Sequence, residues 1–464
     1  MKKTTAGKKP LNSVALLFFI TIAAALLTYV IPAGQYTRVL LNGRNVVDPA
    51  SFTFIESKAA SIFDIFLAVP SGMINAVSLI VGAMLIGGGL ECIQASGAMN
   101  VGIARTIKKV GIAKGNLILV ILFYVFALMG GFLGFIEGSI PFIPIAISIA
   151  IGLGYDSIVG VAIAIVGAIA GFTCGPTNPY TVAVAQTIAG LDIYSGIGLR
   201  IAMFLLVPAL CLFYILRYAK LVRKDPSRSL VANVDVSDLA FDAAAFESQP
   251  FTGAHAAILL SLTLGIVTYV YGAINWGWSF AHLGAVFVII GIVAGALSRL
   301  GVNGTTETFI KGASGMTAAC FIMGVAYGIS WMLNKASVLD TIVYYLSSPL
   351  SGLPTVVSAV GILLVISLIN LFIPSGSGKA LIVMPIVLPI AQIVGIESQV
   401  AILAYQFGDG LTNLCTPLLG VLLLALGFGR VPFSKWERFI LPLVGILFVV
   451  ACAFMILAMQ IGYR

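Results

Sequence analysis

Four short polar interruptions break long apolar stretches of this sequence, and they are where chemistry is most plausible. Two are turn-like and charged, and read Ile136-Glu137-Gly138-Ser139 and Pro374-Ser375-Gly376-Ser377-Gly378-Lys379. The other two cover residues 171–179 and 408–417, and both contain Thr-Asn. If the flanking stretches cross a membrane, backbone that leaves a helix at that depth must line a cavity in the protein. We therefore expect the four breaks to form one binding site.

The residue types at the breaks suit the binding of small ions and polar solutes. Exposed N–H groups at a helix start attract anions, and C=O groups at a helix end coordinate cations. Hydroxyl and amide oxygens add neutral ligands. The predicted substrate-binding residues are Glu137, Ser139, Thr177, Asn178, Ser375, Ser377, Lys379, Asp409, Thr412 and Asn413. Candidates for coupling Na⁺ or H⁺ among them are Glu137, Ser139, Thr177, Asn178, Asp409, Thr412 and Asn413.

Three of these residues are ionisable, and a charge at membrane depth suggests function. Lys379 could contact a substrate carboxylate, while Glu137 or Asp409 binds a cationic substrate group, H⁺ or Na⁺. Lys379 could instead stand in place of a bound sodium, or form a structural ion pair with Asp409. The sequence leaves these roles open.

Residues next to the breaks carry weaker signals. Tyr180, Thr181, Gln186 and Gln406 flank the breaks and are expected to line the cavity. Arg200 lies near the end of an apolar stretch and is expected to be an interface anchor.

The composition places the chain in a membrane. Of its 464 residues, 60% are hydrophobic and 9% are charged, whereas soluble domains average about 25% charged residues. The net charge of +8 comes from Lys and Arg in short loops between apolar stretches. This is the positive-inside pattern and does not indicate nucleic acid binding. Neither a catalytic constellation nor a metal-ligand cluster is evident, so the sequence predicts neither an enzyme nor a metal site beyond Na⁺.

The apolar pattern predicts an all-α polytopic protein with about nine transmembrane helices and two re-entrant hairpins. A first unit, residues 1–222, holds spans 11–32 and 75–95, hairpin 115–154, broken span 157–190 and span 197–217. A cytosolic connector, 223–253, and a linker span, 254–273, follow. A second unit, 282–464, holds spans 282–299 and 314–334, hairpin 353–396, broken span 398–428 and span 437–460. Counting each hairpin as two spans gives an eleven-span alternative with the same charge distribution.

The two units resemble each other at an offset of about 240 residues. Five crossings separate equivalent helices in the nine-span model, so the second unit is inverted relative to the first. Inverted repeats with interrupted helices at corresponding positions indicate a transporter with a site near the midplane.

The run from Phe372 through Lys379 to Pro385 and Pro389, followed by residues 408–413, resembles the C4-dicarboxylate anaerobic carrier-like family, and most closely its YfcC-type subgroup. The resemblance covers essentially the whole chain. Related families are the divalent anion/sodium symporters and the aminobenzoyl-glutamate transporters. The resemblance implies a scaffold with two hairpins, elevator-type movement and a homodimer. The symporters carry Ser-Asn-Thr at each hairpin tip, and both tips depart from it here, which puts a two-sodium mechanism in doubt.

These observations predict a secondary active transporter of a small carboxylate-bearing metabolite. Similar family members are assigned to basic amino acid exchange such as arginine for ornithine, and a cavity with both signs of charge favours that substrate. C4-dicarboxylate transport coupled to H⁺ or Na⁺ is the alternative. We expect a multi-pass protein of the bacterial inner membrane with a cytoplasmic N-terminus. No cofactor is expected, and the partners are the substrate, the lipid bilayer and a second copy of the chain.

Overall fold

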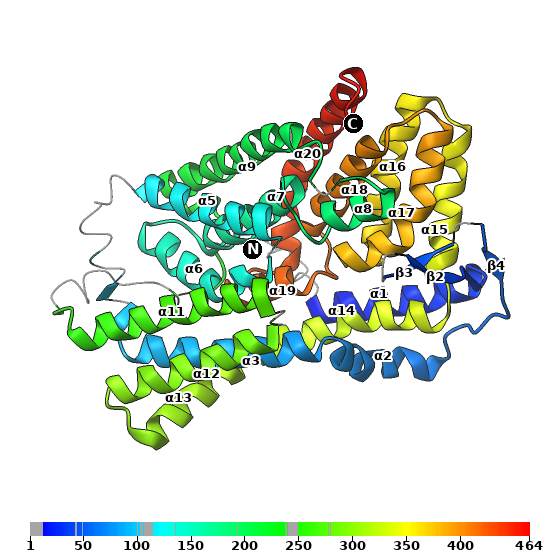
Figure 1. The fold of residues 1–464 in the computed structure, drawn as a ribbon. Helices are drawn as coiled ribbons and strands as arrows, with labels where there is room; N and C mark the ends of the chain where they lie inside the picture. Colours follow the sequence, from blue (N-terminus) through cyan, green and yellow to red (C-terminus); the bar gives the residue numbers. More distant parts are fainter. Residues whose placement is uncertain are drawn as a thin grey trace, which may run out of the picture.

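The chain forms two layers of helices, which lie one above the other in Figure 1. A computed structural model describes residues 13–41, 44–48, 50–99, 101, 102, 105, 115–134, 136–192, 194–236, 239, 249–276, 278 and 280–464. The lower layer contains α1 (Ser13–Val30), α2 (Ile62–Asn75), α3 (Val77–Ala95), α11 (Gly253–Trp276), α12 (Phe280–Leu297), α13 (Gly301–Gly315) and α14 (Thr317–Lys335). The upper layer contains α5 (Gly115–Leu133), α6 (Ile143–Gly152), α7 (Ser157–Cys174), α8 (Val182–Ala189), α9 (Ile197–Lys224), α15 (Leu339–Ser347), α16 (Thr355–Asn370), α17 (Gly376–Ile393), α18 (Ser398–Asn413), α19 (Gly420–Phe428) and α20 (Phe433–Gln460). Short 3₁₀ turns are η2 (Glu137–Phe142), η3 (Pro226–Arg228) and η4 (Ser348–Gly352).

Two kinked helix pairs build the centre of the lower layer. Helices α2 and α3 meet at Ala76, and α13 and α14 meet at Met316. Helix α2 packs on α14, and α3 packs on α13. Helices α1 and α12 cover α14 and α3 respectively. The lower layer therefore contains two similar sets of three helices, α1–α3 and α12–α14, in the same order. Each set packs against the last helix of the other.

Glycines allow the backbones of the paired helices to approach each other closely at these contacts. A β-carbon added to Gly328 in α14 would lie 2.3 Å from the Ala68 carbonyl oxygen of α2. In the matching contact, a β-carbon on Gly312 in α13 would lie 2.3 Å from the Gly87 carbonyl oxygen of α3. Small residues permit such close approach in membranes, where lipid provides no hydrophobic drive for helix association.

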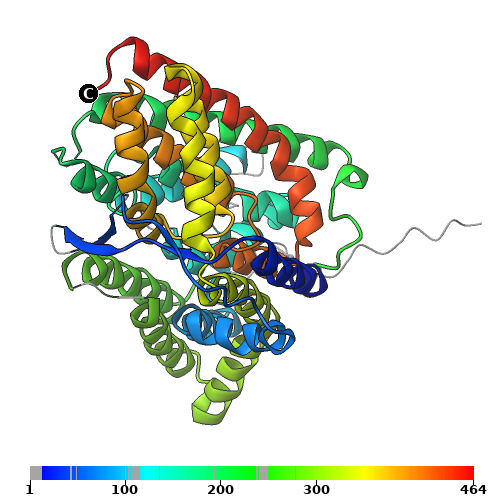
Figure 2. The same ribbon diagram turned by 90° about the vertical axis from the view of Figure 1, so that its right-hand side faces the viewer.

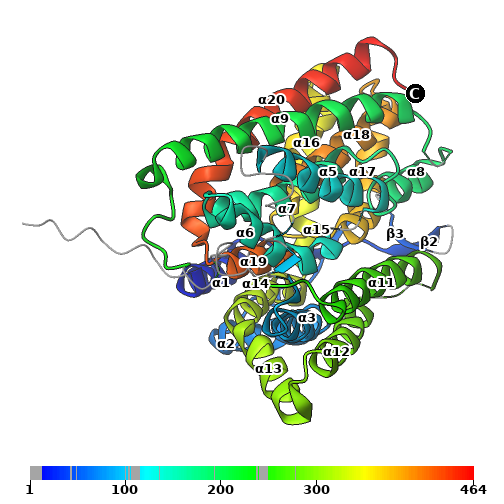
Figure 3. The same cartoon turned by 90° about the vertical axis from the view of Figure 1, so that its left-hand side faces the viewer.

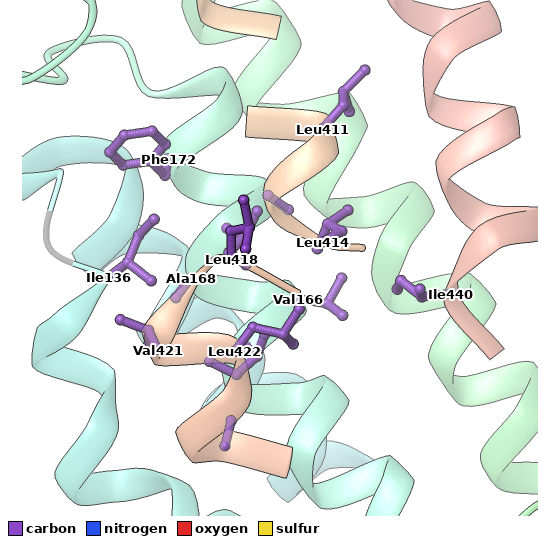
Figure 4. Packing of buried hydrophobic residues seen from close by; sticks show 14 of the residues in the cluster. Ile136, Val166, Ala168, Phe172, Leu411, Leu414, Leu418, Val421, Leu422 and Ile440 are labelled. Atoms are coloured by element: carbon purple, nitrogen blue, oxygen red, sulfur yellow. The ribbon is translucent and has the colours of Figure 1, made fainter. Parts of the chain in front are cut away.

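Helices α7 and α18 are the buried centre of the upper layer. Every residue of α7 is buried. Helix α5 packs on α7, α16 packs on α18, and α7 contacts α18. The outer helices α9 and α20 run side by side in Figure 3. The Tyr214 hydroxyl of α9 donates to the Phe439 carbonyl of α20 at 2.6 Å. Apolar residues around the break between α18 and α19 share one buried cluster with α7, as Figure 4 shows for Leu414, Leu418 and Val166.

The lengths and apolar composition of these helices are consistent with a multi-pass membrane protein. Five of the described helices are long and apolar enough to cross a membrane: Val77–Ala95, Ser157–Cys174, Ile197–Lys224, Gly376–Ile393 and Phe433–Gln460. The pair Gly301–Gly315 and Cys320–Lys335, bent by 44°, gives a sixth if it is one span. The mostly helical fold is confirmed, whereas the nine-span count, the hairpins and the division into two units stay predictions.

Two features were not expected from the sequence. Helices α2 and α13 extend the predicted spans that begin near residues 75 and 314. Between α1 and α2, the strands β1 (Gly34–Gln35) and β4 (Thr53–Phe54) pair, and so do β2 (Arg38–Leu41) and β3 (Arg44–Val47). All-α was thus an incomplete description. The sequence Asn42-Gly43 between β2 and β3 is a hairpin signal that could have revealed the second pair.

The β2–β3 ribbon reaches across to the upper layer, as Figure 2 shows. Strand β3 contacts α17. Arg38 forms two hydrogen bonds to the carboxylate of Asp340 in α15, at 2.6 and 2.9 Å. The backbone N–H of Tyr36 donates to the same carboxylate at 3.0 Å. The ribbon therefore links the two layers through a charge-assisted contact.

The glycine contacts generate the first prediction. Gly328→Ala should destabilise the protein because the added methyl group meets the Ala68 carbonyl, and overpacking costs about 1–3 kcal/mol. Gly445→Ala in α20 is the control, because no atom lies within 4 Å of its added β-carbon. Thermal unfolding in detergent measures both variants. Equal midpoints for the two variants would contradict the close packing of α2 on α14.

Candidate functional site

The polar turn at residues 374–379 lies within the predicted hairpin 353–396 and is called the second hairpin turn below. A helix cap closes it. The Ser375 hydroxyl accepts a hydrogen bond from the Gly378 N–H at 3.2 Å, and α17 begins at Gly376. The first N–H groups of a helix have no partner within it. Their partial positive charge makes this turn suitable for an anionic group.

One turn into α17, Lys379 is completely buried in an ion pair. Its ammonium lies 2.6 Å from Asp409 Oδ1 of α18, and the two side chains are 0% and 1% exposed. The ammonium also donates to Asn370 Oδ1, at the end of α16, at 2.5 Å. It lies 5.6 Å from the centre of the Tyr405 ring. The pair thus joins α16, α17 and α18.

Asn370 organises the second helix break. Its amide nitrogen shares two N–H groups among three acceptors of α18, the Asp409 carbonyl at 2.9 Å, Thr412 Oγ1 at 2.8 Å and Asn413 Oδ1 at 2.8 Å. The Tyr405 hydroxyl donates to the Gly376 carbonyl. The oxygens of Thr412 and Asn413 are therefore already engaged by a protein donor.

The first break is held by Asn178 in a similar local way. Its amide nitrogen donates to the Phe172 carbonyl at 3.0 Å, and its Oδ1 accepts from the N–H groups of Tyr180 and Thr181 at 2.9 and 3.2 Å. Thr177 donates to the Phe132 carbonyl at 3.1 Å. These bonds satisfy backbone that has left α7, as required away from water.

In the first hairpin turn, Ser139 is buried and donates to the Ile136 carbonyl at 2.7 Å. The side chain of Glu137 lies outside the described residues. The prediction that Glu137 binds substrate or a coupling ion therefore stays a prediction.

A cavity of about 370 Å³ lies where the breaks face the lower layer. From the upper layer it is lined by the second hairpin turn, by Phe172 and Tyr180, and by Asn413. Aromatic residues of the lower layer face it, namely Tyr269, Trp278 and Tyr327. None of its described lining residues carries a charge.

Beside α18, the structure corrects the expectation for Arg200. It is fully buried and not an interface anchor. Its guanidinium donates to Gln399 Oε1 at 2.9 Å, to the Ser195 carbonyl at 2.9 Å and to Gln406 Oε1 at 3.3 Å. Gln406 in turn donates to the Gly175 carbonyl at 2.9 Å. This network ties the first break to α18.

The predicted residues therefore separate into three groups. Ser375, Ser377 and Asn413 line the cavity. Lys379 and Asp409 pair with each other and are not among the lining residues. Ser139, Thr177, Asn178 and Thr412 bond to nearby backbone carbonyls. Their roles in binding stay predictions. Tyr180 lines the cavity as expected, whereas Gln186 and Gln406 belong to the Arg200 network.

Sequence reasoning missed Asn370 and the aromatic residues of the lower layer. Asn370 is a lone polar residue at the end of an apolar stretch, and that position was a usable signal. Tyr269, Trp278 and Tyr327 lie far from the breaks in the sequence, and nothing local marks them.

The buried ion pair generates the second prediction. Lys379→Met or Asp409→Asn leaves an unpaired buried charge and should cost about 3–5 kcal/mol of stability. The double variant removes both charges and should recover most of that loss. Thermal unfolding in detergent provides the measurement.

Lys311→Met is the control for this prediction, because Lys311 pairs with Glu91 at 2.7 Å but is 78% exposed. Such a pair contributes no more than about 1 kcal/mol. Single variants at Lys379 and Asp409 that unfold like the parent protein would show that the pair is not formed as described.

Comparisons with known proteins agree on one family. The model of the C4-dicarboxylate anaerobic carrier family matches residues 12–460. The Escherichia coli (strain K12) protein named "Putative basic amino acid antiporter YfcC" is 32% identical, over 98% of this chain and 97% of its own length. An uncharacterized protein of Haemophilus influenzae is 28% identical over 97% of both chains.

Solved structures of two transporters also align with the chain. One is the Alcanivorax borkumensis YdaH transporter, with a TM-score of 0.43 and 19% identity over 98% of this chain and 99% of that one. The other is Neisseria gonorrhoeae MtrF, with a TM-score of 0.41 and 17% identity over 97% and 95%. The family match over nearly the whole chain is the decisive finding: this chain belongs to the C4-dicarboxylate anaerobic carrier family and is a membrane transporter, not an enzyme.

Proposed function

We propose that the protein is a secondary active transporter that exchanges basic amino acids, such as arginine for ornithine, across the cytoplasmic membrane. The observation that carries the proposal is the cavity between the layers. It combines the N-terminus of a helix with an aromatic wall, and its described lining residues are uncharged.

The substrate carboxylate binds at the second hairpin turn. Ser375, Gly376 and Ser377 line the cavity at the start of α17. Backbone N–H groups and the helix dipole favour an anion there. The side chains of Ser377 and Asn413 are close enough to the same cavity to add hydrogen bonds.

The cationic end of the substrate faces the aromatic wall. Trp and Tyr rings attract guanidinium and ammonium groups through their negative faces. Tyr269 of α11, Tyr327 of α14 and Trp278, which lies between α11 and α12, line the same cavity as the hairpin turn. A basic amino acid carries an α-carboxylate with an α-ammonium beside it and a second cationic group at the far end of its side chain; the carboxylate and the distant cation match the two walls.

C4-dicarboxylate transport coupled to H⁺ or Na⁺ is the second candidate, and the name of the family supports it. A dicarboxylate carries two negative charges, and the described lining offers one helix N-terminus and no cationic side chain. Lys379 is the nearest cation of the second hairpin, and its ammonium is engaged by Asp409 and Asn370. The relative named a basic amino acid antiporter supports the first candidate.

Lys379 acts as a tethered cation at the second helix break. Its ammonium is surrounded by the oxygens of Asp409 and Asn370, where a free cation would otherwise bind. This half of the site then needs no sodium at that position. The proposal selects one of the roles that the sequence left open.

Transport follows from movement between the two layers. The cavity lies between them, so sliding of the upper layer would carry a bound solute past the lower one in an elevator-type movement. We also propose two inverted repeat units, a homodimer, and an inner-membrane location with a cytoplasmic N-terminus. The matching crosswise contacts of α2 with α14 and α3 with α13 support the repeat.

The third prediction tests the substrate. Proteoliposomes loaded with arginine should take up labelled arginine or ornithine, and malate-loaded vesicles should not, because exchange needs a substrate on both sides. Malate counterflow without arginine counterflow would reject the amino acid and favour the dicarboxylate. Each arm is run with and without a sodium gradient.

The fourth prediction tests the aromatic wall. Trp278→Leu should raise the KM for arginine about 2- to 30-fold, because a cation–π contact contributes about 0.5–2 kcal/mol. Trp276→Leu is the matched control, since Trp276 is exposed and does not line the cavity. An unchanged KM in the Trp278 variant would place the cationic end elsewhere.

A further inference from the structure

A second cavity, of about 380 Å³, lies between the two layers and away from the breaks. Helices α3 and α13 of the lower layer form one wall, and α6 and the end of α19 form the other. Its described lining residues include Glu91, Lys311 and Arg430, whereas the described lining of the cavity at the breaks carries no charge. We call this second space the charged cavity.

The two cavities lie along the same interface. On the upper layer, Leu419 before α19 lines the cavity at the breaks and Phe428 at its end lines the charged cavity. On the lower layer, Leu79 and Glu91 of α3 line the first and the second. At about 1.5 Å of rise per helical residue, the cavities are displaced by about 13 to 18 Å. A solute that leaves the breaks along this interface therefore reaches the charged cavity.

An ion pair joins α3 to α13 at the charged cavity. The Lys311 ammonium lies 2.7 Å from Glu91 Oε1, and the two side chains are 78% and 24% exposed. A pair with such an exposed partner contributes no more than about 1 kcal/mol. The pair can therefore open for a charged solute at little cost.

We propose that the Glu91–Lys311 pair binds the zwitterionic head group of an α-amino acid. The α-carboxylate accepts from the Lys311 ammonium, and the α-ammonium donates to the Glu91 carboxylate, so every charge keeps an opposite partner. The site is additional to the proposed substrate cavity. Its role as a stopping point during exchange rests on the proposed function.

The charges of the cavity favour a zwitterion over other solutes. Its described lining has one carboxylate and two basic side chains, one of which, Arg430, donates to the Asp235 carbonyl at 3.1 Å. A purely cationic solute would meet a surplus of positive charge. A dicarboxylate would take Lys311 and leave Glu91 without a cation. An α-amino acid head group satisfies both members of the pair.

The same lining makes the site indifferent to a cationic side chain. Gln94 and Ser148 add neutral polar groups, and the described lining has no second carboxylate for a distant cation. The charged cavity should therefore bind a neutral amino acid such as alanine as well as arginine. The cavity at the breaks should instead require the distant cationic group.

Protection of an introduced thiol tests the site without transport. Gln94→Cys places a thiol at the half-buried lining of the charged cavity. Its modification by a maleimide is followed by mass spectrometry on the purified protein in detergent. Arginine and alanine should slow the reaction by a factor of 1 + [L]/Kd, about threefold at twice the Kd. Malate and agmatine, which is arginine without its carboxylate, should leave the rate unchanged.

Three variants assign any protection to the pair. Glu91→Gln should abolish protection by alanine, because the α-ammonium loses its partner. Glu397→Gln is the matched control, since Glu397 pairs with Arg464 at 2.9 Å and is not among the lining residues. Trp278→Leu should retain protection by alanine, because Trp278 lines the other cavity. The thiol of Ser227→Cys, at an exposed position, should react at one rate in every solution.

Several outcomes would overturn the site. One is a Gln94→Cys thiol that stays unmodified while Ser227→Cys reacts. Others are protection that survives Glu91→Gln, protection that is lost in Trp278→Leu, and protection by agmatine or malate that equals protection by alanine. Arginine counterflow tests the transport function separately. Protection by alanine without arginine counterflow would reject the proposed function and keep the site, and the reverse result would reject the site alone.

Discussion

The ammonium of Lys379 between Asp409 and Asn370 is the contact on which the candidate site depends. It is wholly buried, so its charge must be balanced by the protein, and Asp409 provides that balance at 2.6 Å. Because the three residues come from α16, α17 and α18, the same contact sets the position of the second hairpin turn relative to the second helix break. The start of α17, and with it the proposed carboxylate subsite, is held by electrostatics in addition to apolar packing.

A second feature of the structure is the way in which the two helical layers pack. Within the lower layer, glycines bring α2 against α14 and α3 against α13 at backbone distance, which favours a rigid unit. Between the layers lies a cavity lined by aromatic and hydroxyl groups. The ribbon β2–β3 crosses between the layers and is fastened through Arg38 and Asp340. The proposed elevator-type movement would take place at this interface and would have to accommodate the contact of Arg38 with Asp340.

The sequence predicted the helical class and the breaks that surround the site, because Gly, Pro, Ser and Asn interrupt apolar stretches that are otherwise continuous. It also identified Lys379 and Asp409, since charged residues are conspicuous in such stretches. It could not choose between an ion pair and a substrate contact, which depends on how α17 packs against α18. The sequence also could not predict the burial of Arg200, or the aromatic wall formed by Tyr269, Trp278 and Tyr327, because both depend on contacts between helices that are distant in sequence. Helix α13 was missed because its polar residues resemble those of a loop, and α2 because it is shorter than a membrane span and contains Pro70.

The central claim is that a basic amino acid binds in the cavity with its carboxylate at the start of α17 and its cationic end against the aromatic wall. An experimental structure of the purified protein with arginine tests this most directly. The account predicts arginine density with the carboxylate beside Gly376 and Ser377, and the guanidinium beside Trp278 and Tyr327. Density in the reverse orientation, or a substrate carboxylate bound to a Lys379 released from Asp409, would contradict it.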